Sequence, residues 1–323
     1  MARLRYIENF DIGFTRKRVG DGWLYFDPDG RAVRAKSVIS RLEALALPPA
    51  YENAWYCAYT NGHIQAIGID AKGRRQYRYH PDFSARRDAD KYTRVLDFAD
   101  RLPAIRRQVY ADISRRNLSL NRVVAGVIRL LDVGKVRVGN TKYAVENKSF
   151  GATTLNNRHV QFRGSRVILE YVGKSGKEQR ISINDRRLTT IIKQCRDLPG
   201  QTLFQYVDDE GTLRPITSGH VNDYLREHAG EFSAKDFRTW GASVIAYSAL
   251  VRERGDISLK QMLAEVAAEL GNTPAIARKS YVHPAIIEAA QSRATAGMTW
   301  KLPRPSKYLS AEERGLINFL QRP

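Results

Sequence analysis

A lysine, an arginine and a tyrosine follow one another in an order that suits one kind of chemistry. Lys235 and Arg238 lie in the run Lys235-Asp-Phe-Arg-Thr-Trp-Gly241, and Tyr281 follows further along the chain. Cleaving a phosphodiester with side chains alone needs a nucleophile, positive charge on the non-bridging oxygens, a proton for the leaving oxygen and a device that positions the phosphate. Arginine binds phosphate through two hydrogen bonds, and lysine can supply the proton. The set suits phosphodiester cleavage by a tyrosine nucleophile.

Tyr281 is the candidate nucleophile. Thr273-Pro274 predicts a helix start, with Thr as N-cap and Pro at the first position, so Tyr281 would lie roughly 12 Å along the helix axis. The flanking Arg278, Lys279 and His283 would lower the pKa of its phenol and attract a nucleic-acid backbone. On local sequence alone, an ordinary half-buried tyrosine at a helix end is the commoner case, because the chain has 16 tyrosines.

Three cations could complete the chemistry, and each also has an ordinary structural interpretation. Arg238 lies in a core-like helical run, where it could simply stack on its own helix. Lys174 lies at a predicted hairpin tip, where a loop lysine is usually solvated but could act as a mobile general acid. Arg137 follows an apolar helix and could be a surface arginine. The sequence contains neither a phosphate-cradling glycine loop nor a metal-ligand spacing, so no metal or cofactor is expected.

A basic and aromatic strand is predicted in the first third of the chain. In Arg74-Arg-Gln-Tyr-Arg-Tyr79, strand geometry places Gln76 and Arg78 on one face, and Tyr77 and Tyr79 on the other. Arginine and glutamine can contact base edges in the major groove, and tyrosine can contact backbone and bases. An amphipathic edge strand without this role fits the pattern equally well.

The charge of the chain favours nucleic acid as its partner. There are 53 Lys and Arg against 34 Asp and Glu, which gives a net charge of +19 spread along 323 residues. Such a surface neutralises phosphates and releases counterions. Cys57 and Cys195 are the two cysteines and suggest neither a metal site nor a disulfide framework, so a reducing, cytoplasmic location is expected. No signal peptide or membrane helix is predicted.

The hydrophobic periodicity changes along the chain and predicts an α+β protein of two domains. Residues 1–90 carry short β-prone runs separated by turn signals, which predicts a small β-rich domain. Residues 91–323 are predicted to be mostly helical, with helices expected at 88–102 and 103–116 and an interdomain linker near 81–92. A small antiparallel sheet is predicted at 159–183, with its last hairpin tip at Gly173-Lys-Ser-Gly-Lys177.

Taken together, these positions resemble the type IB DNA topoisomerases of the poxvirus-like and bacterial branch, over nearly the whole chain. The matching motifs are Pro48-Pro-Ala50, Asn61-Gly-His-Ile-Gln65, Gly73-Arg-Arg-Gln-Tyr-Arg-Tyr-His-Pro81, Arg137-Val-Gly-Asn-Thr-Lys-Tyr143, Gly151-Ala-Thr-Thr-Leu155, Tyr171-Val-Gly-Lys174, Lys235-Asp-Phe-Arg-Thr-Trp-Gly241, Gly271-Asn-Thr-Pro274 and Ser280-Tyr281. Each motif alone is weak, but their order and spacing together are specific.

The resemblance implies a role for each matching residue. Tyr281 would form a 3′-phosphotyrosyl bond and release a 5′-hydroxyl strand, Arg137 and Arg238 would clamp the transition state, and Lys174 would protonate the leaving oxygen. Strand swivelling and religation would then relax supercoils of either sign without ATP. The DNA contacts implied by the matching motifs are Gln76, Tyr77, Tyr79, Asn140, Lys142, Tyr143 and the supporting cation Lys235.

One position departs from the family pattern. The poxvirus and nuclear enzymes have His where this chain has Asn272. Asn can donate a hydrogen bond to a non-bridging oxygen but cannot carry charge, so cleavage is expected to be slower by about 10-fold if one charge-assisted bond is weakened.

Two rivals remain at this stage. A tyrosine recombinase or integrase shares the nucleophile, but usually has His-x-x-Arg where this chain has Lys235-Asp-Phe-Arg238, and a helical N-terminal domain. An architectural DNA clamp would explain the charge but not the ordered catalytic set. The sequence therefore predicts a monomeric, bilobed clamp on double-stranded DNA at the bacterial nucleoid. In the free protein we expect an open clamp, with Tyr281 away from the arginines.

Overall fold

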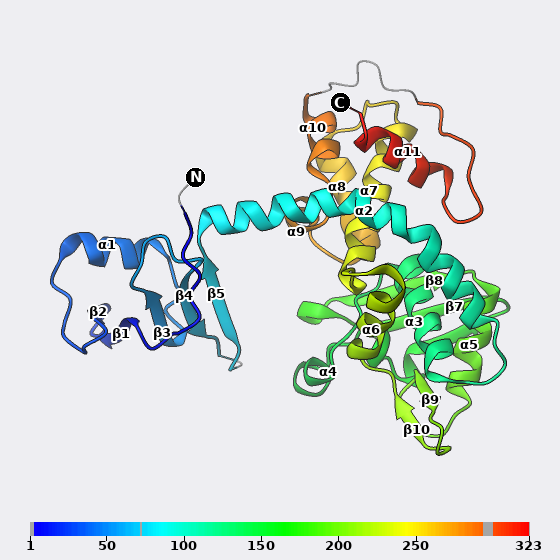
Figure 1. Cartoon of the computed structure of the whole chain (residues 1–323), viewed down its shortest axis with the longest axis horizontal. Coiled ribbons are helices and arrows are strands. Elements are labelled where there is room, and N and C mark those ends of the chain that lie inside the picture. Colours follow the sequence, from blue (N-terminus) through cyan, green and yellow to red (C-terminus); the bar gives the residue numbers. More distant parts are fainter. Residues whose placement is uncertain (1–2, 72, 293–299, 323) are drawn as a thin grey trace. The chain divides into compact units, whose positions relative to one another are not determined.

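The computed structural model describes residues 3–71, 73–292 and 300–322 (Figure 1). The backbone packs as two compact units, Met1–Lys91 and Tyr92–Pro323. In the part of the chain that is described, no helix has the length and apolar character needed to cross a membrane. Both cysteines, Cys57 and Cys195, are buried free thiols. The mixed architecture confirms the predicted α+β class.

The first unit is built on a five-stranded antiparallel sheet. Its strand order is β2-β1-β3-β4-β5, and the strands are β1 Gly13–Val19, β2 Gly22–Phe26, β3 Glu52–Cys57, β4 Ile64–Ile69 and β5 Arg75–Tyr79. The helix α1, Lys36–Ala44, packs on the sheet through Leu42, which shares a small core with Tyr25 and Tyr56. The Asn-Gly signal at 61–62 lies between β3 and β4, as expected for a hairpin.

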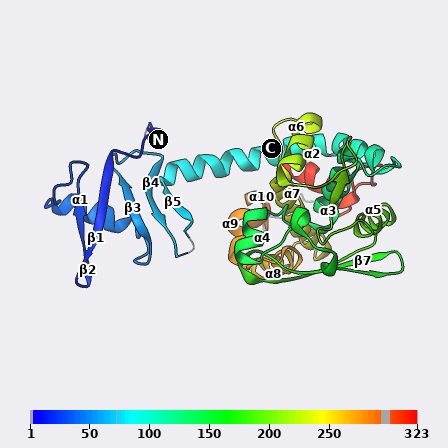
Figure 2. The same cartoon turned by 90° about the horizontal axis from the view of Figure 1, so that it is seen from below.

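The second unit is mostly helical (Figure 2). Its helices are α3 Leu120–Gly134, α4 Thr141–Asn147, α5 Arg186–Arg196, α6 Ser218–Ala229, α7 Ala234–Arg252, α8 Leu259–Leu270, α9 Pro274–Ser280, α10 Pro284–Ser292 and α11 Ala311–Leu320. The helix α3 is buried along most of its length and packs against α5, α6 and α7. It is therefore the helix around which the core of this unit is assembled.

Two sheets accompany these helices. A three-stranded antiparallel sheet has the order β6-β7-β8, with strands Val160–Arg163, Arg166–Val172 and Glu178–Ile183. The short strands β9, Gln205–Val207, and β10, Leu213–Pro215, form a separate hairpin. The predicted sheet at 159–183 is confirmed, and the tip at 173–177 joins β7 to β8.

The predicted break at Pro103 is wrong, whereas the boundary between the two units, at Lys91/Tyr92, lies within the predicted linker range 81–92. One helix, α2, runs from Pro81 to Ile113 with Pro103 inside it. Proline removes one backbone donor but keeps a φ angle compatible with a helix, and apolar packing compensates here. Val95, Leu102 and Ile105 on the two sides of Pro103 are all buried in the same core, so the buried stripe continues across it.

Candidate active site

Tyr281 lies where α9 ends. Thr273 accepts a hydrogen bond from the Ile276 amide through its side chain at 3.3 Å, and proline follows at the first helical position, as the sequence predicts. The helix ends at Ser280, one residue before the predicted end, and Tyr281 is its C-cap. Tyr281 is half-buried and packs against the main core. Its amide donates to the carbonyl of Ala277 at 3.1 Å, so its backbone is fixed at the end of a capped helix.

Arg238 joins three segments that are distant in sequence. It is only 5% exposed on α7, and its guanidinium donates to the carbonyl of Lys135, after α3, and to that of Leu270, at the end of α8, at 3.0 Å. Its guanidinium carbon lies 5.2 Å from the centre of the Tyr281 ring. The expectation that Tyr281 lies away from the arginines is therefore wrong for this structure.

The phenol of Tyr281 has a lowered pKa. Burial alone raises that pKa, but the charges of Arg238 and Arg137, a hydrogen bond with Arg238 and the charge of Lys174 together bring it below 10.0. The predicted sources of the shift, Arg278, Lys279 and His283, are not among its largest causes. Arg278 and Lys279 are exposed on α9, whereas tertiary packing brings in cations from other elements.

Arg137 and Asn272 form a direct pair beside this centre. The Nη2 atom of Arg137 donates to the Oδ1 atom of Asn272 at 2.5 Å. Asn272 follows Gly271, which has a left-handed φ of +59° in the turn between α8 and α9. The Nδ2 atom of Asn272 is buried and makes no hydrogen bond in the structure. A buried N–H group without a partner, beside an arginine, is suited to donate a hydrogen bond to an anionic oxygen.

The β7–β8 hairpin tip brings two lysines, Lys174 and Lys177, to the site that contains Tyr281 and Asn272. Lys174 is exposed at the start of the tip, and its charge acts on the phenol of Tyr281. Lys177, at the other side of the tip, donates to the main-chain carbonyl of Asn272 at 3.0 Å. The sequence interpretation did not single out Lys177, although the run Gly173-Lys-Ser-Gly-Lys177 contains it. A second lysine directly across a tight hairpin was the signal that could have found it.

A second tyrosine lies within reach of the same arginines. Tyr171 on β7 is buried, and burial raises the pKa of its phenol to about 12, although Arg238 and Arg137 act to lower it. Its phenol therefore stays neutral under conditions in which Tyr281 ionises more readily. The opposite pKa shifts of the two phenols single out Tyr281 as the candidate nucleophile.

The remaining predicted contacts in the second unit are exposed side chains around α4 and α7. Asn140 accepts from the amide of Tyr143 at 3.2 Å and so caps α4, which gives it a structural task. Lys142 pairs with Glu146 at 3.8 Å, and the Tyr143 side chain is 43% exposed. Lys235 is exposed on α7, one turn before Arg238.

The predicted contacts in the first unit lie on β5, an edge strand of its sheet. Tyr77 and Tyr79 are 40% and 39% exposed, and their rings stack at 5.9 Å, so they share a face as predicted. Gln76 donates through Nε2 to the Oδ2 atom of Asp70 at 2.9 Å. This bond fixes the orientation of the Gln76 amide.

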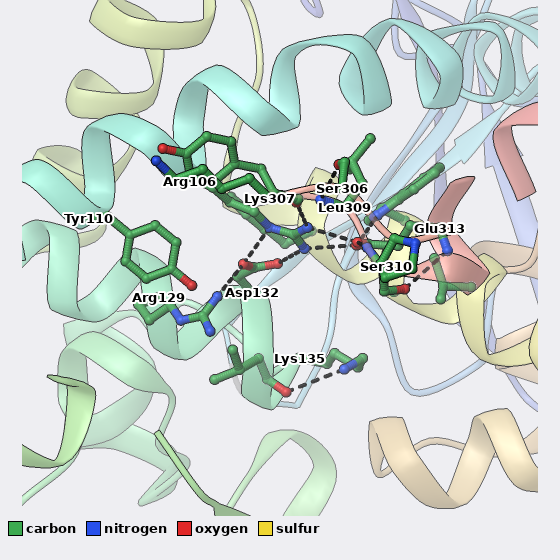
Figure 3. A pocket seen from close by; sticks show the side chains of 17 residues that line it. Arg106, Tyr110, Arg129, Asp132, Lys135, Ser306, Lys307, Leu309, Ser310 and Glu313 are labelled. Carbon is green, nitrogen blue, oxygen red and sulfur yellow. Dashed lines mark hydrogen bonds and ion pairs between the residues drawn. The ribbon is translucent and has the colours of Figure 1, made fainter. Parts of the chain in front are cut away.

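A buried ion-pair network supports α7 on the side of a cavity of about 480 Å³ (Figure 3). Arg106 on α2 bonds to Asp132 at 2.7 Å and to Glu313 on α11 at 2.8 Å. The indole nitrogen of Trp240 on α7 donates to Glu313 at 3.0 Å. The network ties α2, α3 and α11 to the helix that carries Arg238, so its task is structural.

Comparison with known proteins identifies the class to which this fold and site belong. Residues 80–302 match the family described as the catalytic core of eukaryotic DNA topoisomerase I, and residues 22–70 match the N-terminal domain of bacterial DNA topoisomerase IB. The chain therefore belongs to the type IB DNA topoisomerase family.

Curated relatives agree with this assignment. DNA topoisomerase 1B of Acanthamoeba polyphaga mimivirus is 32% identical over 295 residues, which cover 87% of this chain and 88% of the relative. DNA topoisomerase 1B of vaccinia virus (strain Copenhagen) is 24% identical over 259 residues, covering 75% and 77%. A solved structure of the XerH site-specific recombinase bound to its palindromic difH substrate is 15% identical, with a TM-score of 0.35. That match covers 55% of this chain and 47% of the recombinase, and it carries no argument about function.

Proposed function

We propose that the chain relaxes supercoiled double-stranded DNA by transient cleavage of one strand through Tyr281. The observation that carries the proposal is the phenol of Tyr281, whose pKa is lowered by Arg238, Arg137 and Lys174 against the effect of burial. The phenolic oxygen attacks the scissile phosphorus, the bond from phosphorus to the 5′-oxygen breaks, and a 3′-phosphotyrosyl ester forms. The 5′-oxygen takes a proton and leaves as a hydroxyl.

Each task of this step falls to a side chain near Tyr281. Arg238 and Arg137 hold the non-bridging oxygens, and the unpaired Nδ2 atom of Asn272 donates to one of them. Lys174 gives the proton to the leaving 5′-oxygen, and Lys235 adds a supporting positive charge. The phosphotyrosyl ester conserves the energy of the phosphodiester, so the reverse attack by the 5′-hydroxyl reseals the strand without ATP, and the scheme needs no metal or cofactor.

The two units would share the duplex between them. Residues 1–90 form the DNA-binding domain, with Tyr77, Tyr79 and Gln76 as contacts, and residues 91–323 form the catalytic domain. In the second domain, Asn140, Lys142 and Tyr143 lie on or beside α4 and would contact the backbone near the cleavage site. We propose a monomer that closes around DNA as a clamp and allows the free strand to swivel, relaxing supercoils of either sign. The proposal includes a location at the nucleoid, in the bacterial cytoplasm, and the match of residues 22–70 to a bacterial N-terminal domain supports it.

The test is relaxation of supercoiled plasmid in EDTA without ATP, with wild type beside Tyr281→Phe. Relaxation by the wild type that is lost in the variant supports the proposal, and denaturation during the reaction should trap a covalent complex with DNA. Tyr171→Phe is the matched control, because it removes the other phenol near the arginines and should still form the complex. If clean, DNA-binding wild type relaxes nothing, the recombinase alternative replaces the proposal, and joining of two specific sites becomes the assay.

A further inference from the structure

The tip of the β7–β8 hairpin is tied to the turn between α8 and α9. The Nζ atom of Lys177 lies 3.0 Å from the carbonyl oxygen of Asn272, and both groups are partly buried. On the hairpin side, the amide of Gly173 donates to the carbonyl of Lys177 at 2.7 Å. These two bonds connect Lys177 to Gly173 on one side and to Asn272 on the other. Gly173 directly precedes Lys174, and Asn272 is bonded to Arg137.

A second contact joins the same two segments. A Cβ atom added to Gly271 would lie 2.1 Å from the side-chain oxygen of Gln179, so the amide of Gln179 on β8 rests directly on the Gly271 backbone. Lys177 directly precedes β8, and Gln179 is the second residue of that strand. The hairpin therefore docks on the turn through two side chains at the start of β8.

Apart from the contacts of Lys177 and Gln179, the hairpin tip has few interactions that would hold Lys174 in place. Ser175 and Gly176 both have positive φ angles, 65° and 73°, so the loop is a tight turn. Lys174 is exposed, while its charge reaches the phenol of Tyr281. If the tip moves, the Lys174 amine moves with it, so Lys174 stays within reach of the site only while the backbone of the tip is held. In this structure Lys177, three residues further on, holds the tip through its bond to the Asn272 carbonyl.

We infer that Lys177 is a positioning residue for Lys174: by binding the Asn272 carbonyl it holds the hairpin tip where Lys174 can protonate the leaving 5′-oxygen. The inference rests on the proposed function, because it assigns a task within the proposed cleavage step. Lys177 itself does not transfer the proton. Its removal should slow only the part of the reaction that needs Lys174, whereas the attack by Tyr281 should keep its own rate.

Replacing the leaving 5′-oxygen by sulfur separates the protonation step, which needs Lys174, from the attack by Tyr281. In a duplex whose scissile 5′-oxygen is replaced by sulfur, a thiolate leaves, and because thiols have a pKa near 8.5 it departs without protonation. The experiment measures single-turnover formation of the covalent complex on matched 5′-oxygen and 5′-sulfur duplexes. The variants are Lys177→Met, Lys177→Arg, Lys174→Met and the Lys174→Met/Lys177→Met double variant. The control is Lys260→Met, which changes an exposed lysine at the start of α8.

The expected pattern is specific. Lys177→Met should slow cleavage of the 5′-oxygen duplex by about 10-fold and leave cleavage of the 5′-sulfur duplex within about 2-fold of wild type. Lys174→Met should show the same selectivity with a larger loss. Lys177→Arg keeps a donor for the Asn272 carbonyl and should recover most of the rate. Lys260→Met should match wild type on both duplexes.

Three outcomes would overturn the inference. Cleavage of the 5′-oxygen duplex by Lys177→Met at the wild-type rate would mean that the tether has no effect. An equal loss on both duplexes would instead mean that Lys177 acts on the phosphate or on folding. An additive loss in the Lys174→Met/Lys177→Met double variant would mean that the two lysines act independently. If wild type forms no covalent complex on either duplex, the proposed function itself fails, and that result is distinct from the other three.

Discussion

The guanidinium of Arg238 lies over the ring of Tyr281, with its central carbon 5.2 Å from the ring centre. Arg238 is nearly fully buried and is held by two main-chain carbonyls, those of Lys135 and Leu270. A cation fixed in this way keeps its position when the phenol loses its proton. The pair therefore favours the ionised tyrosine before any substrate is bound.

The pH dependence of cleavage should report this pair. Burial raises the pKa of the Tyr281 phenol, but Arg238, Arg137 and Lys174 bring it below 10.0, so the cleavage rate should rise with pH with a midpoint below pH 10. Arg238→Ala removes a positive charge, so its profile should shift to higher pH, and Arg238→Lys should shift less. The measurement is single-turnover cleavage across pH. Superimposable profiles for wild type and Arg238→Ala would contradict the assigned cause.

Asn272 should limit the rate of the chemical step. Its Oδ1 atom accepts from Arg137, which leaves its neutral Nδ2 group as the donor for phosphate. Asn272→His adds a group that can carry charge, and we expect cleavage to be faster by about 10-fold. Single-turnover cleavage by the two proteins at one pH is the measurement. An Asn272→His variant that cleaves no faster would count against this role for the position.

Gly271 should be intolerant of alanine for two separable reasons. Its φ of +59° costs an L-residue about 1 kcal/mol, and a Cβ atom would displace the Gln179 amide from the turn. Gly271→Ala should therefore lower both the free energy of unfolding and the cleavage rate. Gly164→Ala is the matched control, since Gly164 has a φ of +62° with open space around the added Cβ. Denaturant unfolding and cleavage are measured for both variants, and an equal loss of cleavage in the two would refute the contact argument.

Glu313 should contribute stability that depends on pH. Burial raises the pKa of its carboxyl, but Arg106 outweighs burial and the net pKa is below 4.5, so the stabilisation is present above pH 4.5 and is lost as pH falls through the folded-state pKa. Glu313→Gln should lower the free energy of unfolding at pH 7 by about 3 kcal/mol, because Arg106 loses one of its two carboxylates.

The same variant should also flatten the loss of stability on acidification. Denaturant unfolding at pH 7 and at pH 4 measures both effects. Glu269→Gln, which changes an exposed glutamate of α8, should behave as wild type. A Glu313→Gln protein with wild-type stability at pH 7 would show that the network is energetically neutral.

Local signals predicted most of the elements near the site. The Thr273-Pro274 start of α9 and the strands β7 and β8 follow from residues close in sequence, and the structure confirms them. The short helices α4 and α10 were not predicted, because neither offers more than two or three helical turns of pattern. The order of the catalytic residues came from the family resemblance rather than from local pattern.

Long-range packing explains what the sequence could not supply. The continuity of α2 across Pro103 depends on a core shared with distant helices. The cations that lower the pKa of Tyr281 come from other elements, whereas the sequence interpretation chose its neighbours Arg278 and Lys279. Lys177 lies in a hairpin run that the sequence shows, but its bond to Asn272 joins two elements that are distant in sequence. A linear pattern gives residue types and spacing, but not which elements meet.

The two buried thiols make this protein convenient for site-specific labelling. Burial raises the pKa of the Cys57 thiol, and raises that of the Cys195 thiol to about 12, so neither presents a reactive thiolate at neutral pH. The sequence contains no other cysteine. A single cysteine introduced at Ser175 would therefore react alone with a maleimide dye, and the natural protein needs no cysteine-free background. A fluorophore at that site would follow the hairpin tip directly as the protein binds DNA.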